Sequence, residues 1–154
     1  TWLADRPYTK GGFGYLDGEP LYVSSKIGTK EDILTITDDI GLYQTMRIET
    51  AGYQFDVKDG WYEVELLLVE HYPQSRRFVD GIESPERLGE ATVMDVKVNN
   101  TEVFKNLDLV EVYGYNYPLR KKIKVKAVNN EGIKIRLKAL KGKTYLSGLR
   151  VRNY

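Results

Sequence analysis

The last third of this 154-residue chain alternates apolar and charged residues, and this alternation most constrains its fold. The stretch from 122 to 127 runs Lys122, Ile123, Lys124, Val125, Lys126, Ala127. After the turn Asn129–Gly132 the pattern returns over Ile133–Ala139, and it recurs over Leu149–Arg152. Successive strand residues point to opposite faces, so the pattern predicts three antiparallel strands with one buried face and one wet face. Such strands with frequent turns favour an all-β sandwich.

The middle of the chain also predicts strands. We expect them over Leu42–Glu49, Gly52–Val57 and Trp61–Glu70, with a tight hairpin turn at Lys58–Gly60. The run Leu66–Val69 is apolar at every position, which indicates a central strand covered on both faces.

Polar and turn-forming residues mark the next segments. Residues 73–90 contain two prolines and two glycines, and we expect a long surface loop there. Thr92–Val98 and Thr101–Lys105 should form a hairpin across Asn99-Asn100, and Leu107–Tyr113 could form one short helical turn.

Composition excludes several classes of protein. A hydrophobic content of 42% is too high for a disordered chain. The absence of cysteine excludes disulfides and cysteine nucleophiles, and no apolar run approaches the ~20 residues of a membrane span. Because the chain opens at Thr1 without an initiating methionine, we expect a single domain over residues 1–154, excised from a larger protein.

Charge is distributed unevenly although the net charge is only +1. From Tyr115 to Tyr154 there are 12 basic residues and a single acidic one, Glu131. One interpretation is that basic strands pair laterally with acidic ones such as Glu63-Val64-Glu65. The other is a basic face that attracts an anionic polymer.

Several segments together resemble the malectin-like domain family. These segments are Asp5–Tyr8, Gly11–Tyr15, Leu42–Arg47, Gly60–Val64, Val69–Tyr72, Met94–Asn100 and Thr144–Val151. The resemblance covers nearly the whole chain and implies an antiparallel jelly-roll-like β-sandwich that binds carbohydrate through loops at one end. It further implies a module of the kind appended to bacterial glycoside hydrolases, hence a secreted, periplasmic or cell-surface location.

By position, the resemblance places the sugar-contacting residues at Tyr15, Tyr43, His71 and Tyr72. A tyrosine presents a flat apolar ring with a polar tip, which suits the C–H faces and hydroxyls of a sugar. His71 stands where the family has an aromatic residue, so one stacking surface is smaller here.

A second departure concerns charge. The family has an aspartate near the last turn, whereas this chain has Lys141-Gly142-Lys143. With Arg76 and Lys143 as polar partners, we expect a uronic-acid-containing, pectin-like glycan, because cationic donors match carboxylates.

Structural alternatives exist for these residues. Tyr43 could be a buried tyrosine with a satisfied hydroxyl, and His71 a solvated loop residue. Arg76 could be a solvated loop arginine, and Trp61 a core anchor. Tyr113, Tyr115 and Tyr117 alternate beside a further loop and could extend the binding end or pack.

Catalytic and metal chemistry has little support in the sequence. No pair of carboxylates stands out for glycoside hydrolysis, and His71 is the only histidine, with no nucleophile elbow elsewhere. We therefore expect no enzyme activity, no cofactor and no metal at His71. A structural calcium near Asp38 and Asp39 is conceivable, although the spacing is not that of an EF-hand.

Three hypotheses remain. The favoured one is a non-catalytic carbohydrate-binding module that targets a parent glycoside hydrolase to polysaccharide. The alternative is a structural or interaction domain packed against its parent enzyme without binding sugar. Nucleic-acid binding is disfavoured, because the basic strands are not interleaved with surface aromatics.

Overall fold

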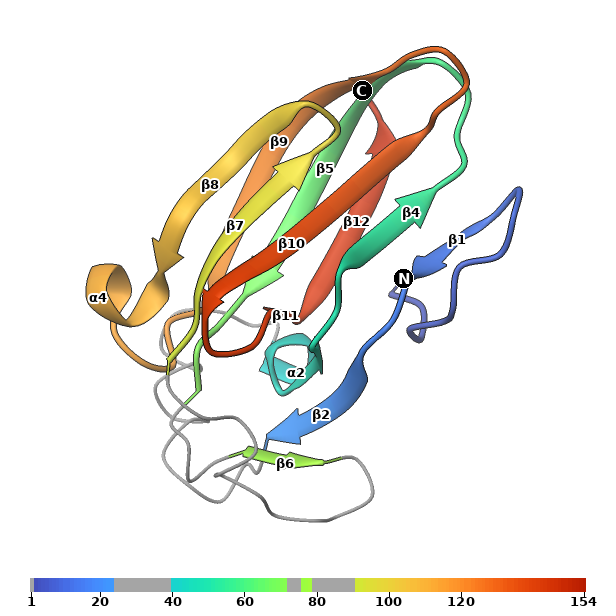
Figure 1. Ribbon diagram of the computed structural model, residues 1–154. Helices are drawn as coiled ribbons and strands as arrows, with labels where there is room; N and C mark the ends of the chain where they lie inside the picture. Colours follow the sequence, from blue (N-terminus) through green and yellow to red (C-terminus); the bar gives the residue numbers. More distant parts are fainter. Residues whose placement is uncertain (1, 24–39, 72–75, 79–90) are drawn as a thin grey trace.

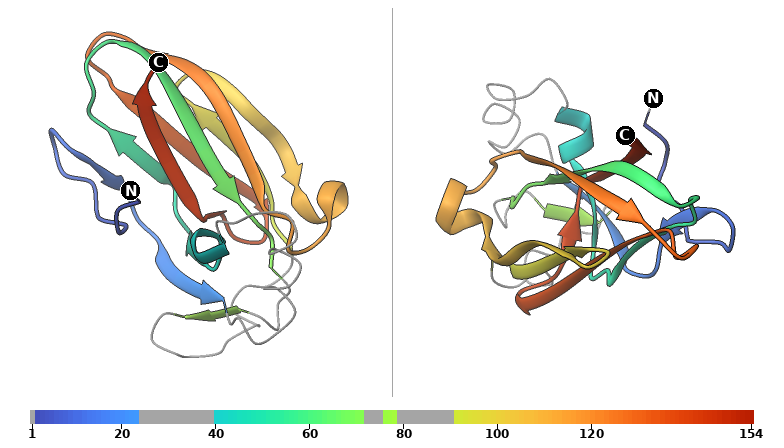
Figure 2. Two further views of the ribbon diagram at one scale, coloured as in Figure 1. Left: turned by 180° about the vertical axis from the view of Figure 1, so that it is seen from behind. Right: turned by 90° about the horizontal axis from the view of Figure 1, so that it is seen from above.

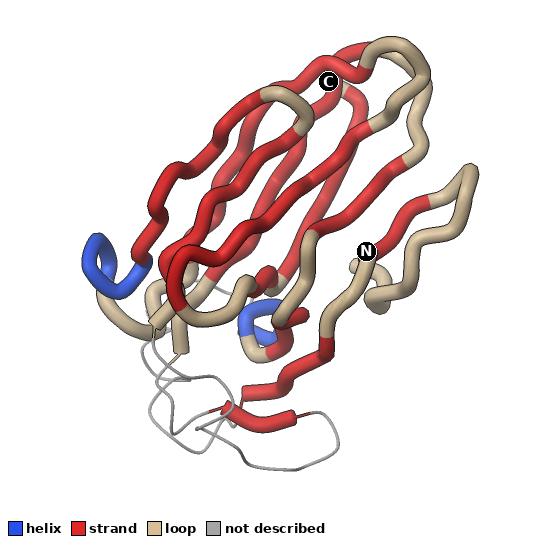
Figure 3. Tube along the Cα trace, in the orientation of Figure 1, coloured by secondary structure: helices blue, strands red, loops and turns tan. Residues whose placement is uncertain are grey.

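The computed structural model describes residues 2–23, 40–71, 76–78 and 91–154 (Figure 1). Strands dominate these ranges, and Figure 3 shows only short helical segments among them. The helices are α2 (Ile40–Tyr43) and α4 (Leu109–Tyr113). The strands are β1 (Phe13–Tyr15), β2 (Glu19–Val23), β3 (Thr45–Ile48), β4 (Gly52–Phe55), β5 (Gly60–Leu68), β6 (Arg76–Phe78), β7 (Val93–Val98), β8 (Thr101–Asp108), β9 (Leu119–Ala127), β10 (Ile133–Lys141), β11 (Tyr145–Leu146) and β12 (Gly148–Asn153).

The described strands form antiparallel sheets. One has the order β1-β4-β10-β7-β8, a second β12-β5-β9, and a third β11-β3-β2-β6. The first two lie face to face, and Figure 2 shows β12, β5 and β9 together on the side opposite to β10 and β7. This arrangement confirms the predicted all-β sandwich. Neither helix of the described ranges has the length and apolar character needed to cross a membrane.

The core fills the space between the two facing sheets. The inward side chains of β5, Val64, Leu66 and Leu68, are fully buried. Opposite them, β7 and β10 contribute a second buried layer of alternate residues, namely Met94, Val96, Val98, Ile133, Ile135 and Leu137. The period-two pattern read from the sequence therefore gives the correct buried face of β10.

Strand β5 is the central strand of its sheet, as the apolar run Leu66–Val69 predicts. Its outward face carries Glu65, whose side chain is 0% exposed. Three cations surround this carboxylate. They are Arg120 at 3.6 Å and Lys122 at 3.6 Å on β9, and Arg150 at 3.0 Å on β12. The lateral pairing of basic strands with acidic ones is thus confirmed.

Several connections differ from expectation. The turn at Lys58–Gly60 is not a hairpin, because β4 pairs with β1 and β10 while β5 pairs with β9 and β12. The three strands of the last third do not pair with one another either. The turn Asn129–Gly132 instead carries the chain from β9 in one sheet to β10 in the facing sheet. Alternation predicts which face of a strand is buried but not its neighbour.

Two further expectations concern local structure. The strand predicted over Leu42–Glu49 begins only at Thr45, because Leu42 and Tyr43 belong to α2. The hairpin across Asn99-Asn100 is confirmed, with Asn99 at φ 52°, and Asp108 caps α4 by accepting a hydrogen bond from the Glu111 amide. The loop expected over residues 73–90 is interrupted by β6, and Asp38 and Asp39 lie outside the described residues.

Gly52 lies where β4 approaches β10 most closely. Its φ is +145°, and a Cβ at this position would lie 1.8 Å from the carbonyl oxygen of Ile135. We expect Gly52→Ala to lower the free energy of unfolding by about 3 kcal/mol or more. Gly60→Ala is the matched control, because Gly60 has φ +151° with nothing within 4 Å. Urea unfolding of both variants checks this, and equal losses would contradict the role of close packing.

The Glu65 cluster gives a second prediction. Glu65→Gln removes the buried charge and leaves three partly exposed cations repelling one another, so we expect a loss of roughly 1–3 kcal/mol in the free energy of unfolding. The exposed turn residue Glu131 provides the control, since Glu131→Gln should change stability by no more than about 0.5 kcal/mol. Thermal or urea unfolding of the two variants measures this difference. Equal stabilities of Glu65→Gln and Glu131→Gln would contradict a stabilising role of the Glu65 cluster.

Candidate functional site

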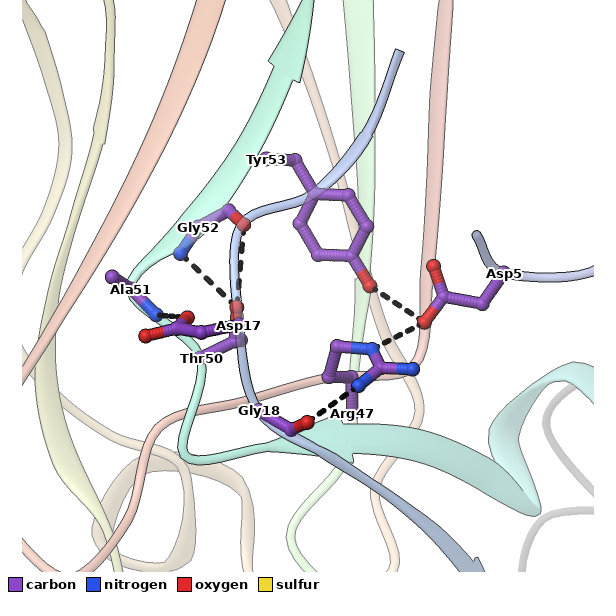
Figure 4. Close-up of polar contacts among 8 residues, drawn as sticks. All are labelled: Asp5, Asp17, Gly18, Arg47, Thr50, Ala51, Gly52 and Tyr53. Carbon is purple, nitrogen blue, oxygen red and sulfur yellow. Dashed lines mark hydrogen bonds and ion pairs between the residues drawn. The ribbon is translucent and has the colours of Figure 1, made fainter. Parts of the chain in front are cut away.

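A polar network joins the N-terminal segment to the start of the sandwich (Figure 4). Arg47 of β3 is buried, and its Nε donates to Asp5 Oδ2 at 2.6 Å while Nη1 donates to the Gly18 carbonyl at 2.8 Å. The hydroxyl of Tyr53 on β4 donates to the same Asp5 oxygen at 3.3 Å. These contacts fix the guanidinium in one orientation, because an arginine has donors in a rigid planar fork.

Tyr53 is sensitive to this environment. Burial raises the pKa of the Tyr53 phenol well above its ordinary value, and the negative charge of Asp5 raises it further, with Arg47 opposing. The phenol therefore keeps its proton in the folded protein at pH values where an exposed tyrosine loses it.

Tyr15 lies directly on this network. Its ring is half-buried, and the guanidinium carbon of Arg47 lies 3.4 Å from the ring centroid. Strand pairing also places Tyr15 opposite Tyr53. One face of the Tyr15 ring is thus occupied by a cation held in place by Asp5.

Tyr43 and His71 lie beneath the surface rather than at an open rim. Tyr43 is 1% exposed, and its hydroxyl donates to the Leu119 carbonyl at 3.3 Å. His71 is 0% exposed, and its Nε2 lies 2.7 Å from the Tyr43 carbonyl oxygen, which can only accept. The structure therefore gives Tyr43 the buried position of the alternative interpretation, and His71 is not a solvated loop residue. Their role in sugar contact stays a prediction.

Lys143 lies near His71 but has a partner of its own. Both residues line a small cavity of about 10 Å³, which has room for about one water molecule and not for a sugar ring. The Lys143 ammonium lies 3.0 Å from Glu49 Oε1. Glu49, the residue after β3, thus places a carboxylate beside the last turn, where the family has an aspartate.

The other two predicted site residues are placed less fully. Tyr72 lies outside the described residues. Arg76 belongs to β6, opposite Val23 of β2, so it lies in a strand rather than in the expected loop. Among the described candidates, His71 contacts Tyr43 and shares the small cavity with Lys143, whereas Tyr15 lies on the Arg47 network.

A larger groove runs between the N-terminal segment, β4 and β12. Its volume is about 1210 Å³, and its lining includes Arg47 and Tyr53 of the polar network as well as Phe55, Leu149 and Val151. β12 is an edge strand, so this groove follows an open side of the sandwich. Mostly apolar clefts of this kind are common places for a ligand or a neighbouring domain.

The sequence did not predict the Asp5–Arg47 contact or the exposure of Trp61. Nothing local links Asp5 with Arg47, because their contact spans 42 positions. Trp61, in contrast, is 50% exposed and is not a core anchor. The strand pattern contained that signal, since Trp61 alternates in phase with Glu63 and Glu65.

The raised pKa of Tyr53 predicts a dependence of stability on alkaline pH. Up to about pH 10 both folded and unfolded chains keep this proton; above it the unfolded chain releases the proton first. The free energy of unfolding should then fall with rising pH, and in Tyr53→Phe it should fall less steeply by about 1.4 kcal/mol per pH unit. Urea unfolding between about pH 9 and pH 11.5 measures both slopes, with each protein at the lower pH as its own reference. Equal slopes of the unfolding free energy against pH in the two proteins would contradict the retention of the Tyr53 proton in the folded state.

Comparison with known proteins agrees with the fold and the motifs. The malectin domain profile matches residues 6–153. A β-glucuronidase of Bacteroides uniformis is similar over 99% of this chain and 16% of its own, with 30% identity and a TM-score of 0.78. β-Glucuronidase 2 of that organism, covalently bound to cyclophellitol-6-carboxylate aziridine, matches over 99% of this chain and 15% of its own, with 29% identity and a TM-score of 0.78.

A more distant likeness extends to plants. The extracellular domain of ANXUR2 from Arabidopsis thaliana has a TM-score of 0.64 at 14% identity, over 91% of this chain and 40% of that chain, which shows a shared fold. No curated protein matches this chain significantly. The profile match spans nearly every residue, so the chain belongs to the malectin domain family, a carbohydrate-binding type of domain.

Proposed function

We propose that this chain is a non-catalytic carbohydrate-binding module that directs a parent glycoside hydrolase to polysaccharide. The observation that carries the proposal is the match of 99% of the chain to 16% of a β-glucuronidase chain at 30% identity. A domain of this size within a much longer hydrolase suits a targeting role. The parent would then act outside the cytoplasm of a bacterium: secreted, in the periplasm or on the cell surface.

The ligand we propose is a uronic-acid-containing, pectin-like glycan. Tyr15 would supply the ring on which the sugar packs, because the Asp5–Arg47 ion pair holds that ring in place. The named activity of the similar B. uniformis enzyme, which acts on glucuronides, points to the same class of acidic sugar. Lys143 contributes less than the sequence suggests, since Glu49 already neutralises it.

One observation favours the alternative, a domain that packs against its parent enzyme and binds no sugar. The groove beside β12 is lined by the partly exposed apolar side chains of Leu149 and Val151, and among the described strands β12 lies at the edge of its sheet. Exposed apolar surface of this kind is typical of contacts between domains. The burial of Tyr43 also removes one of the three rings that the sugar site would use.

Affinity electrophoresis separates the two functions. The protein should be retarded in gels containing polygalacturonate, and retarded less as salt rises, because exposed charge pairs are screened beyond ~8 Å at physiological ionic strength. Tyr15→Ala should weaken retardation about tenfold, equivalent to roughly 1.4 kcal/mol, whereas Tyr15→Phe keeps the ring over Arg47 and should bind nearly as well.

The controls define what each failure means. Lys134→Ala removes a cation of β10, which lies in the same sheet as Tyr15 but is separated from β1 by β4, and it should not affect binding. Retardation that stays level from low to high salt would contradict the acidic ligand alone. If the protein is retarded neither in a polygalacturonate gel nor in a neutral glucan gel, carbohydrate binding is contradicted and the packing domain is favoured.

A further inference from the structure

The outer face of the sheet β12-β5-β9 aligns residues in rows across the three strands. Each row runs from β12 through β5 to β9. The rows are Arg150–Glu65–Lys122, Arg152–Glu63–Lys124 and, beyond the end of β12, Tyr154–Trp61–Lys126. The third row follows from the hydrogen bond that the Tyr154 amide donates to the Trp61 carbonyl at 3.1 Å. Acidic residues thus occupy the centre of two rows, and an aromatic residue occupies the centre of the third.

Most cations of this face form ion pairs within the face. Arg120, Lys122 and Arg150 pair with Glu65, and Arg152 pairs with Glu63 at 2.6 Å. Lys124 and Lys126 differ, because neither forms an ion pair with a carboxylate in the described part of the chain. Two cations without an ion pair to a described carboxylate therefore lie at one end of the face.

Both of these lysines lie against exposed aromatic rings. The Lys124 ammonium is 3.9 Å from the Tyr154 ring centroid and 4.8 Å from that of Trp61, and the Lys126 ammonium is 5.7 Å from the Trp61 ring. Trp61 is 50% exposed and Tyr154 69% exposed. We call Trp61, Tyr154, Lys124 and Lys126 the aromatic–lysine patch.

We infer that the aromatic–lysine patch is a second glycan-binding surface, which takes a uronate unit of an acidic polysaccharide. The inference rests on the proposed function, in that it assumes the domain recognises carbohydrate. The C–H face of a pyranose packs on the Trp61 ring, as apolar surfaces do on aromatic side chains. The carboxylate at the edge of the same sugar pairs with the ammonium groups that flank the ring. Tyr154, linked to Trp61 through Lys124, offers a second ring to the neighbouring sugar.

Charge complementarity favours an acidic glycan over a nucleic acid. A single-stranded nucleic acid carries a phosphate at every nucleotide and requires cations that track its backbone. Here Arg120, Lys122, Arg150 and Arg152 are held in ion pairs with Glu63 and Glu65, and among the described cations of this face only Lys124 and Lys126 combine an unpaired ammonium with an exposed ring. Two local charges beside two rings match one or two uronate units.

Tryptophan fluorescence tests this surface directly. The chain has two tryptophans, so in a Trp2→Phe background the emission reports on Trp61 alone. Titration with an oligogalacturonate should change that emission in a saturable way and more weakly at high salt. A neutral gluco-oligosaccharide of equal length should produce a much smaller change. Tyr15→Ala should leave the Trp61 response intact, because it alters the other surface.

Affinity electrophoresis in polygalacturonate gels gives the second measurement. Trp61→Ala should weaken binding about tenfold while Trp61→Phe retains most of it, and Lys124→Gln with Lys126→Gln should weaken it comparably. Lys134→Gln makes the same type of charge change on the facing sheet and should have no effect.

The outcomes separate this inference from the proposed function. If the unaltered protein binds the polymer but Trp61→Ala binds equally well and Trp61 emission does not respond, the patch is not a glycan surface, although the proposed function stands. A single-stranded oligonucleotide that changes Trp61 emission more strongly than the oligogalacturonate would also overturn it. If the unaltered protein does not bind the polymer, both this inference and the proposed function are contradicted.

Discussion

A buried carboxylate surrounded by cations organises the three-stranded sheet of this domain. Glu65 has no exposed side-chain surface, yet it lies on the outward face of β5, where Arg120, Lys122 and Arg150 cover it from both neighbouring strands. Removing a charge from water is costly unless several partners replace the solvent, and this requirement fixes β9 and β12 in register with β5. The inward residues of β5 then pack on β7 and β10, and the sandwich closes around them.

The same charge pairing determines what the surface has left to offer. Glu63 and Glu65 form ion pairs with four of the neighbouring cations, so part of the positive charge in the last third of the chain has a structural role. Only Lys124 and Lys126 remain beside the exposed rings of Trp61 and Tyr154. At the other surface, Asp5 and Arg47 hold Tyr15 in place. Both surfaces combine a ring with a cation, and at the aromatic–lysine patch the two cations form no ion pair with a carboxylate of the described residues, which suits an acidic sugar.

The sequence predicts the strands and their buried faces well because both depend on local alternation. Ile133, Ile135 and the run Leu66–Val69 are buried as expected. Strand pairing is harder to predict from the sequence, since the turn at Lys58–Gly60 resembles a hairpin but connects two sheets. The site residues are the hardest to predict. Tyr43 was predicted to contact sugar at the surface, but it lies in the helix α2 and its side chain is buried. The Asp5–Arg47 contact could not be predicted, because only the fold brings these distant positions together.

Nuclear magnetic resonance of the isotopically labelled domain, titrated with an oligogalacturonate, shows whether the sandwich presents its rings and neighbouring cations to an acidic glycan. We expect shifted signals at the Trp61 indole, Lys124 and the neighbourhood of Tyr15 and Arg47, while Val96 and Ile135 in the core stay unchanged. Shifts confined to the part of the groove around Leu149 and Val151, with Arg47 and Trp61 unshifted, or no shifts at saturating sugar, would contradict this expectation.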